Sequence, residues 1–237
     1  MKKSLNNHLI VIAGPTASGK TSLAIQLALH LNCEIISADS RQFYKEISIG
    51  TAKPTYKELS LVKHHFINNK NINELYSAGD YERDVVDLLP KLFAKKNTVI
   101  MTGGSGMYIN AVCNGFDELP RNITVRNELN TLFKLKGIKY LQEELKLKDP
   151  DHFLNIDQKN PQRLIRAIEI CRITNQPYSK LLNKKSKKRN FQIHKIGLKI
   201  NKDVLKNRID QRVDEMLKNG LEKEVRNVFN KKGLNSL

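Results

Sequence analysis

Gly14-Pro15-Thr16-Ala17-Ser18-Gly19-Lys20-Thr21 fits the phosphate-binding pattern G-x-x-x-x-G-K-[ST] in full. An apolar run before it, residues 8–13, predicts a buried strand, and apolar residues at helical spacing over 21–31 predict a helix after it. In this context the loop N–H groups turn toward phosphate oxygens, and the helix adds its positive N-terminal end. We predict that residues 14–21 bind phosphates, with Lys20 on terminal oxygens and the Thr21 hydroxyl facing Mg²⁺. The alternative is a glycine-rich turn that binds nothing.

Beyond this loop, the first half of the chain alternates predicted strands and helices. Apolar runs at 34–38 and 98–102 predict two more buried strands, and apolar spacing predicts helices at 55–62 and 78–95. The order strand, helix, strand, helix, strand is typical of an α/β fold with a parallel sheet.

The character of the sequence changes near Pro120. Residues 122–183 predict successive helices with basic faces, and the run KKSKKR at 184–189 predicts an exposed loop. A strand and two closing helices are then predicted at 191–200, 203–218 and 221–232. We therefore predict an α/β fold, with a P-loop NTPase-like parallel sheet flanked by helices and an inserted helical domain. The core is assigned to residues 1–117 and 191–237, and the insertion to 118–190.

Charge is the strongest bulk signal in these 237 residues, whose net charge is +17. Residues 1–120 carry 13 basic and 11 acidic side chains, whereas 121–237 carry 28 and 13. A basic half joined to a nearly neutral half favours a nucleic acid partner, with a solvated lysine-rich surface as the alternative. No apolar run is long enough to span a membrane, and Cys33, Cys113 and Cys171 form no C-x-x-C pair. We expect a cytoplasmic protein with no membrane partner.

The Asp that an ordinary ATPase uses to bind Mg²⁺ is missing from its usual position in this sequence. The predicted strand 98–102 ends in Thr102-Gly103-Gly104, where an ATPase commonly has an Asp for Mg²⁺. Asp39 instead follows the strand 34–38. Because strand carboxyl ends line the ligand crevice of an open α/β sheet, we expect Asp39 near the phosphates. The alternative is that it only caps a turn.

Six further blocks accompany the loop in order. They are Ile36–Tyr44 (ISADSRQFY), Ile49–Pro54 (IGTAKP), His64–Ile67 (HHFI), Tyr76–Tyr81 (YSAGDY), Gly103–Tyr108 (GGSGMY) and Asn160–Glu169 (NPQRLIRAIE). Together with the phosphate loop they resemble the tRNA dimethylallyltransferases, also called tRNA isopentenyltransferases. The resemblance runs from about residue 8 to residue 230.

The resemblance implies an activity and its partners. Members of that family are transferases that move a dimethylallyl group from dimethylallyl diphosphate to N6 of the adenosine next to the anticodon, in tRNAs that read codons starting with U. It implies Mg²⁺ as the cofactor and tRNA as the partner of the basic insertion. Separately, we expect a monomer. A diphosphate substrate explains a phosphate loop without the ATPase carboxylate.

The resemblance also implies roles for individual residues. Asp39 matches the general base, while Thr21 and Arg212 match residues at the reacting diphosphate; Arg208 is the alternative to Arg212, and a surface ion pair is the alternative role. The flipped adenosine and its neighbours would contact Asp39, Ser40, Arg41 and Gln42. Other contacts with tRNA would come from Ser105, from Arg126, and from a recognition helix with Gln162, Arg163, Leu164, Ile165 and Arg166. For residues 162–166 the alternative is a basic helix surface.

Two other functions stay open on the sequence alone. A P-loop kinase of a small metabolite or nucleoside would share the loop and sheet, although it would not explain the basic half. Family members usually continue past the point where this chain ends, Leu237, with a Gly-Tyr-containing segment and a closing basic helical region. A short tRNA-binding form with impaired catalysis is therefore the second alternative.

Overall fold

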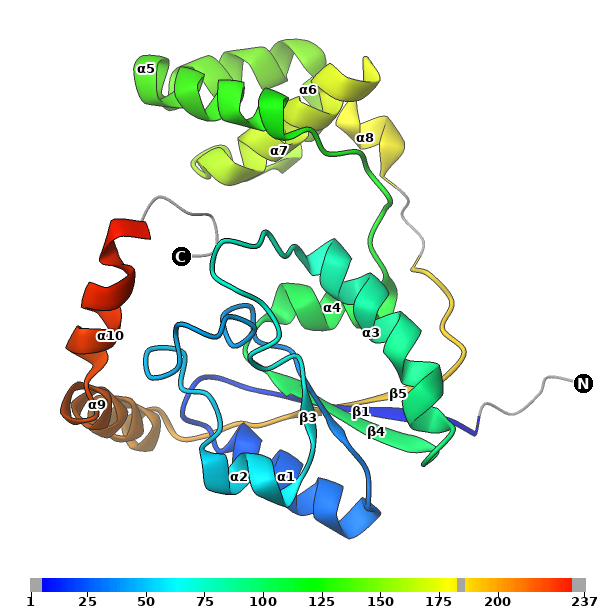
Figure 1. Ribbon diagram of the computed structural model, residues 1–237. Coiled ribbons are helices and arrows are strands. Elements are labelled where there is room, and N and C mark those ends of the chain that lie inside the picture. Colours follow the sequence, from blue (N-terminus) through cyan, green and yellow to red (C-terminus); the bar gives the residue numbers. More distant parts are fainter. Residues whose placement is uncertain (1–5, 183–185, 232–237) are drawn as a thin grey trace, which may run out of the picture. The chain divides into compact units, whose positions relative to one another are not determined.

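The computed structural model describes residues 6–182 and 186–231 (Figure 1). The chain divides into two compact units, which we call the sheet unit, Met1–Phe116 with Lys187–Leu237, and the helical unit, Asp117–Ser186. The sequence placed the return to the core at residue 191, whereas residues 187–190 lie with the sheet unit. Among the described residues, none of the helices combines the length and the apolar composition that a membrane crossing requires.

The sheet unit is built on a five-stranded parallel sheet of order β3-β2-β4-β1-β5. Its strands are β1 (His8–Ala13), β2 (Ile35–Ser37), β3 (His64–His65), β4 (Thr98–Gly103) and β5 (Gln192–Gly197). β1 lies between β4 and β5, so its residues Leu9 and Ile12 are completely buried. A strand covered on both faces must be apolar throughout, which explains the continuous apolar run before the phosphate loop.

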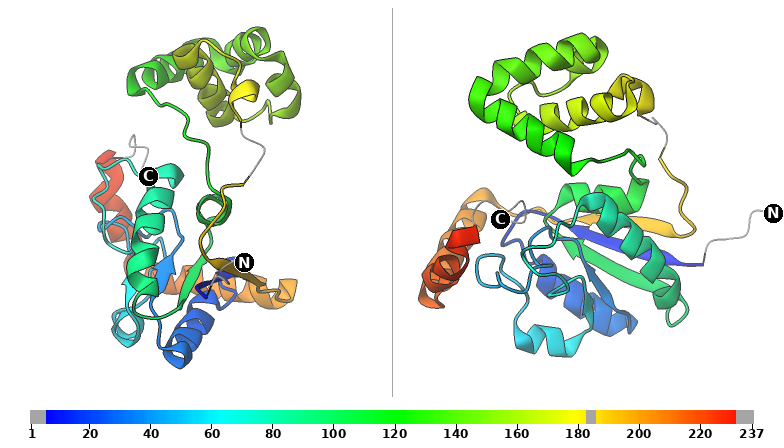
Figure 2. Two further views of the ribbon diagram at one scale, coloured as in Figure 1. Left: turned by 90° about the vertical axis from the view of Figure 1, so that its right-hand side faces the viewer. Right: turned by 45° about the horizontal axis from the view of Figure 1, so that its top comes forward.

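Helices cover both faces of this sheet (Figures 1 and 2). α1 (Lys20–Leu31) and α2 (Tyr56–Leu61) lie on one face, and α3 (Ala78–Phe93) and α4 (Gly106–Asn114) lie on the other. Two separate apolar clusters correspond to these layers, one around Ile12 and Ile25, the other around Val11 and Tyr81. The predicted α/β fold with a parallel sheet is confirmed.

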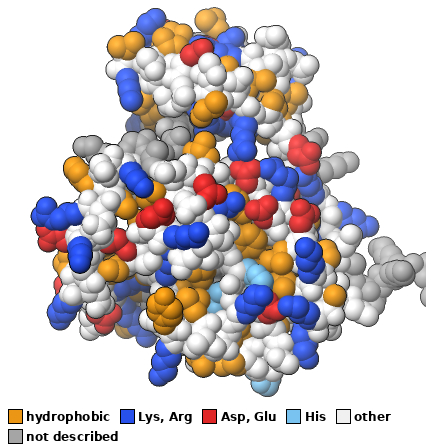
Figure 3. Space-filling view, viewed as in Figure 1, with side chains coloured by type: hydrophobic (Ala, Val, Ile, Leu, Met, Phe, Trp, Pro, Cys, Tyr) orange, Lys and Arg blue, Asp and Glu red, His pale blue; other side chains and the backbone are white. Residues whose placement is uncertain are grey.

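Two helices close the sheet unit at its C-terminal end, α9 (Lys202–Lys218) and α10 (Leu221–Val228), followed by the short turn η1 (Phe229–Lys231). The strand predicted at 191–200 is shorter than expected, because β5 ends at Gly197. On the face shown in Figure 3, Lys and Arg side chains of the sheet unit are interspersed with Asp and Glu.

The helical unit consists of α5 (Ile123–Lys148), α6 (Pro150–Asn155), α7 (Pro161–Thr174) and α8 (Tyr178–Leu181) within its described residues. Gly137 breaks α5, because its φ of 75° and ψ of −175° are not helical. α7 packs its apolar stripe against Leu129, Leu141 and Leu145 of α5. Leu164 and Ile165 belong to that stripe and are completely buried. The prediction that they contact tRNA is therefore wrong for their side chains.

The basic run 184–189 was predicted to be an exposed loop. Residues 184 and 185 lie outside the described residues, and Arg189 contradicts the prediction. Its side chain is only 10% exposed and pairs with buried Glu82 at 2.7 Å. The guanidinium also donates to the carbonyls of Val112 at 2.8 Å and Ala111 at 2.9 Å. Arg189 therefore anchors the returning chain inside the sheet unit.

Candidate active site

The phosphate-binding loop occupies residues 14–19, between β1 and α1. Gly19 caps α1 with φ 87° and ψ 12°, a left-handed conformation that glycine adopts without the steric cost of a side chain. No side chain caps the first turn of α1, and that turn contains no acidic residue. The buried hydroxyl of Ser18 has no hydrogen-bond partner among the described residues. These open donors suit an anion with several oxygens.

Two cations approach this loop: Lys20, which directly follows it, and Arg212 from the C-terminal part of the chain. The Lys20 ammonium folds back and donates to the Pro15 carbonyl at 2.5 Å. Arg212, on α9, donates from Nη1 to the Thr16 hydroxyl at 3.3 Å. Burial and the neighbouring Arg212 charge lower the pKa of Lys20, while the Asp39 carboxylate opposes that shift. Lys20 therefore lies within electrostatic reach of both the arginine and the carboxylate.

Asp39 follows the carboxyl end of β2. Its Oδ1 accepts the backbone N–H of Arg41 at 3.1 Å, a local turn that orients the carboxylate. Oδ2 accepts no hydrogen bond from the described residues, and the Gly104 backbone leaves room beside it, since an added Cβ there would lie 3.8 Å away. Asp39 thus caps a turn with one oxygen and keeps the other available for a proton.

The ends of β2 and β4 approach unusually closely beside Asp39. A Cβ on Gly103 would lie 2.1 Å from the carbonyl oxygen of Ala38, so only glycine fits there. The Ser105 hydroxyl, after β4, accepts the Ser40 N–H at 2.9 Å and bonds the Ser40 hydroxyl at 3.1 Å. The structure therefore brings Ser105 next to Ser40, which directly follows Asp39, by holding two strand ends together.

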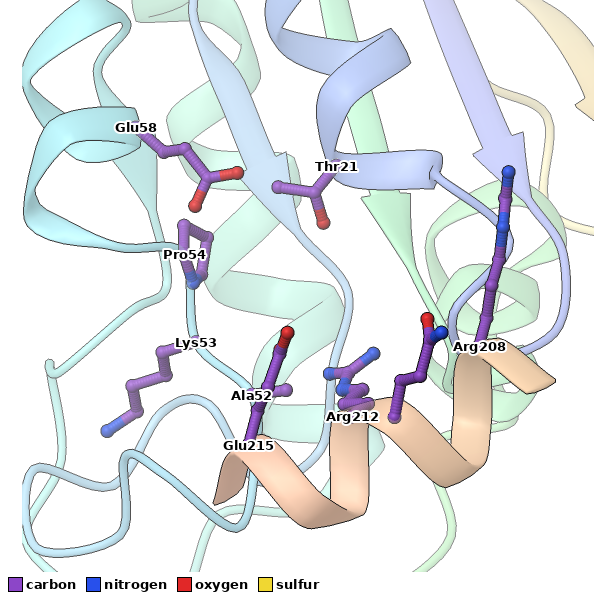
Figure 4. A pocket seen from close by; sticks show the side chains of 9 residues that line it. Thr21, Ala52, Lys53, Pro54, Glu58, Arg208, Arg212 and Glu215 are labelled. Carbon is purple, nitrogen blue, oxygen red and sulfur yellow. The ribbon is translucent and has the colours of Figure 1, made fainter. Parts of the chain in front are cut away.

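A pocket of about 390 Å³ opens beside the loop (Figure 4). Thr21 and Arg212 point into the same space from opposite sides of it. Arg208, one helical turn before Arg212, lines it as well, so both of the arginines considered in the sequence are present. The full lining is Thr21, Ala52, Lys53, Pro54, Glu58, Arg208, Gln211, Arg212 and Glu215.

The donor set at this pocket fits a Mg²⁺ ion that is held mainly by phosphates. Thr21 supplies a hydroxyl oxygen to the pocket, and the Glu58 and Glu215 carboxylates line it. Mg²⁺ prefers oxygen ligands and usually takes one or two from the protein, with water and substrate phosphates completing its coordination. A cluster of three His, Cys, Asp or Glu side chains suited to a metal is absent from the described residues.

Segment 40–42 is fixed by contacts that the sequence did not indicate. Gln42 donates from Nε2 to the carbonyls of Thr51 at 3.2 Å and Ala52 at 3.3 Å. Its Oε1 accepts the Ser37 hydroxyl at 3.1 Å. Gln42 thus joins the end of β2 to the pocket wall, and this side-chain amide has an internal structural role.

In the helical unit, the predicted tRNA contacts Arg126 and Arg166 converge on one buried carboxylate. Arg126 Nη2 lies 2.5 Å from Glu169 Oε2, and Arg166 Nη1 lies 2.9 Å from the same atom. The Asn122 N–H donates to Oε1 at 3.0 Å. Burial alone would raise the pKa of Glu169, but these donors outweigh it and lower that pKa. Both arginine side chains remain about one-third exposed.

The other helical candidates differ in their surroundings. Gln162 and Arg163 are exposed at the start of α7, whose first turn is capped by the Asn160 side chain through the Arg163 N–H at 3.2 Å. The Arg166 guanidinium also donates hydrogen bonds to the carbonyls of Pro120 at 2.9 Å and Leu119 at 3.3 Å. Exposed surface for a polyanion therefore lies at the first turn of α7, while Arg166 also fixes the chain entering the unit.

Comparison with known proteins places this geometry in a family. The family model described as IPP transferase matches residues 42–237, which is most of the chain. The chain belongs to the IPP transferase family. A relative from Flavobacterium johnsoniae named tRNA dimethylallyltransferase is 47% identical, over 97% of this chain and 77% of that protein.

Two solved structures of IPP transferase relatives resemble this chain. The full-length tRNA isopentenylpyrophosphate transferase from Bacillus halodurans matches with a TM-score of 0.63 and 34% identity, covering 97% of this chain and 72% of that one. A eukaryotic dimethylallyltransferase acting on tRNA matches with a TM-score of 0.78 and 26% identity, covering 96% of this chain and 57% of that one. The family model includes Arg212 and the whole helical unit.

Proposed function

We propose that this protein transfers a dimethylallyl group from dimethylallyl diphosphate to N6 of the adenosine next to the anticodon, in tRNAs that read codons starting with U. The observation that carries the proposal is the carboxylate of Asp39 within electrostatic reach of Lys20 and the phosphate loop. A kinase acting on a small metabolite could also use such a carboxylate, but the named relatives favour prenyl transfer.

The nucleophile explains the need for a base. The exocyclic amine of adenine is a weak nucleophile, because its lone pair is delocalised into the ring. Asp39 Oδ2 accepts the proton that N6 loses as the N6–carbon bond forms. The bond between the allylic carbon and the diphosphate oxygen breaks, and its electron pair leaves with the diphosphate.

The phosphate loop and its cations stabilise that leaving group. The loop N–H groups, Lys20 and Arg212 oppose the negative charge that grows on the diphosphate oxygens. Mg²⁺, held by the Thr21 hydroxyl and the diphosphate, would neutralise part of the same charge. We propose that Arg208, which lines the same pocket from the same helix, also contacts the diphosphate.

The helical unit supplies the basic surface for tRNA. We propose that Gln162 and Arg163 contact the tRNA directly, together with the exposed parts of the Arg126 and Arg166 side chains. Ser40, Arg41 and Ser105 are proposed contacts of the flipped adenosine beside Asp39. We propose further that the protein acts as a monomer in the cytoplasm, where tRNA is available; gel filtration and cell fractionation test these two points.

The test uses the full chain with Mg²⁺, dimethylallyl diphosphate and unmodified tRNA reading codons that start with U. The RNA is digested and N6-prenylated adenosine is measured by mass spectrometry. Asp39→Asn keeps an oxygen for the Arg41 N–H but removes the base, so we expect a loss of at least about a hundredfold in rate.

Asp157→Asn is the matched control. Asp157 makes the same turn, accepting the Lys159 N–H at 3.1 Å, and is exposed. Full activity in Asp39→Asn would refute the role of the base. A wild-type chain that binds tRNA and the diphosphate without making product would instead favour the impaired tRNA-binding form, and turnover of ATP without RNA would favour the kinase.

A further inference from the structure

One carboxylate of α10 binds three consecutive backbone N–H groups of a distant loop. Glu224 Oε2 accepts the N–H of Ser48 at 2.6 Å and that of Ile49 at 2.8 Å. Its Oε1 accepts the N–H of Gly50 at 2.9 Å. Charge-assisted bonds of this kind are roughly twice as strong as neutral ones, so this contact fixes the loop firmly to the helix.

Apolar contacts surround this carboxylate on the same helix. Val228 packs with Tyr44 and Ile47 in a small buried cluster, and the Leu221 side chain lies against Gly50, where a Cβ would come within 3.1 Å of it. α10 therefore contacts the loop along its length, with Glu224 between the two apolar contacts.

The loop continues directly into the wall of the pocket. Ala52, Lys53 and Pro54 line that pocket opposite Arg212. The Lys53 ammonium turns back into the loop and donates to the Tyr44 carbonyl, the Ser48 hydroxyl at 3.3 Å and Asn68 Oδ1 at 2.6 Å. A displacement of residues 48–50 would consequently move this wall.

We propose that Glu224 is a positioning residue that holds residues 48–54 as one wall of the diphosphate pocket. α9 carries Arg212 on the opposite wall, and α10 follows it directly in the chain. The same pair of helices therefore sets both walls, one by a side chain in the pocket and one through the backbone amides of the loop. The identity of the ligand as a diphosphate rests on the proposed function, whereas the fastening of the loop does not.

Two variants of Glu224 and one of Glu222 distinguish the fastening of the loop from the binding of the diphosphate. Glu224→Ala removes all three acceptors, and Glu224→Gln keeps one oxygen for them. Glu222→Gln is the matched control, because Glu222 lies on the same helix, is 72% exposed and pairs only with Arg226 among the described residues. A thermal unfolding scan identifies temperatures at which all variants are folded.

The first measurement is amide hydrogen exchange of the peptide that covers residues 45–53. We expect exchange to quicken about tenfold in Glu224→Ala, less in Glu224→Gln, and not at all in Glu222→Gln. Unchanged exchange in both Glu224 variants would overturn the fastening of the loop, whatever the protein catalyses.

The second measurement is the affinity for Mg²⁺-pyrophosphate by calorimetry, with KM values from the prenyl-transfer assay. We expect Kd for pyrophosphate and KM for dimethylallyl diphosphate to rise about tenfold in Glu224→Ala, with KM for tRNA unchanged. Quickened exchange without loss of pyrophosphate affinity would overturn the positioning role. A wild type that binds pyrophosphate but makes no prenylated tRNA would refute the proposed function and leave the positioning role standing.

Discussion

Replacing Glu169 tests the most deeply buried charge of the helical unit. The residue is completely buried, and its carboxylate accepts hydrogen bonds from the Asn122 N–H, from Nε and Nη2 of Arg126, and from Nη1 of Arg166. Breaking a buried ion pair by removing one partner costs about 3–5 kcal/mol. Because both arginines are about one-third exposed, water takes over part of the lost bonding, so we expect about 2–3 kcal/mol for Glu169→Ala.

Glu169→Gln should cost less, about 1–2 kcal/mol, because its oxygen still accepts one or two of these bonds. The assay is urea unfolding followed by circular dichroism, with hydrogen exchange of α5 and α7 peptides to locate the effect in the helical unit. Glu143→Gln is the control, since Glu143 is exposed on α5. Equal stability of wild type and Glu169→Gln at neutral pH would refute the reasoning.

The pH dependence gives a second check on Glu169. Its pKa in the folded protein is lowered from an ordinary value of 4.5, so its stabilising contribution is complete above about pH 4.5. The contribution is lost as pH falls through the folded pKa, because the carboxyl must then take up a proton that the unfolded chain already holds. The stability difference between wild type and Glu169→Gln should therefore shrink in acid; a difference that stays constant down to pH 3 contradicts the charged pair.

Two further variants test the sheet unit. Gly103→Ala should destabilise the fold by about 2 kcal/mol or more in urea unfolding, because the new Cβ meets the Ala38 carbonyl at 2.1 Å, whereas Gly106→Ala, with open space around it, should be neutral or better. Burial lowers the pKa of Lys53 to about 8, so between about pH 8 and 10.5 the unfolded chain binds a proton that the folded protein lacks. The stability of wild type relative to Lys53→Met should therefore rise over that interval, and a flat difference would contradict the shifted pKa.

The sequence predicts the phosphate loop and the position of Asp39 for a simple reason. Both depend on local signals, namely a glycine pattern flanked by a strand and a helix, and a polar residue directly after an apolar strand. In a parallel sheet every strand ends at the same edge, so β2 brings Asp39 to the edge that also carries the loop after β1, with β4 between the two strands. The topology of the sheet therefore brings two short sequence motifs together in one site.

Leu164 and Ile165 show why one prediction failed. The role of tRNA contact was assigned to the whole segment 162–166 from the family resemblance, without regard to which side chains face the core. The sequence did contain the corrective signal, because Leu164, Ile165 and Ile168 recur at helical spacing and form an apolar stripe. Gln162, Arg163 and Arg166 occupy the other positions of the same segment. Helical periodicity should therefore have assigned the first set to the core and kept only the second as candidates for tRNA.

Glu224, Glu82 and Arg189 carried no comparable signal. Glu224 meets residues 48–50 from more than 170 positions away, and Arg189 meets Glu82 from 107 positions away. The sequence does not distinguish a buried charged residue from an exposed one. Ion pairs and hydrogen bonds between residues so far apart in the chain depend on the complete fold. The burial of Arg189 inside a lysine-rich run is therefore visible only in the structure.

The Glu82 carboxylate also explains how the sheet unit tolerates an insertion of about 70 residues within its chain. Oε2 accepts the N–H of Phe116, where the chain leaves the unit, at 2.9 Å, and Oε1 binds Arg189, soon after it returns, at 2.7 Å. Both connections are thus held at one buried side chain of α3. β5, α9 and α10 consequently start from a fixed point, and through them so do Arg212 and Glu224. The residues that line the pocket all belong to the sheet unit, so the geometry of the pocket is set within that unit.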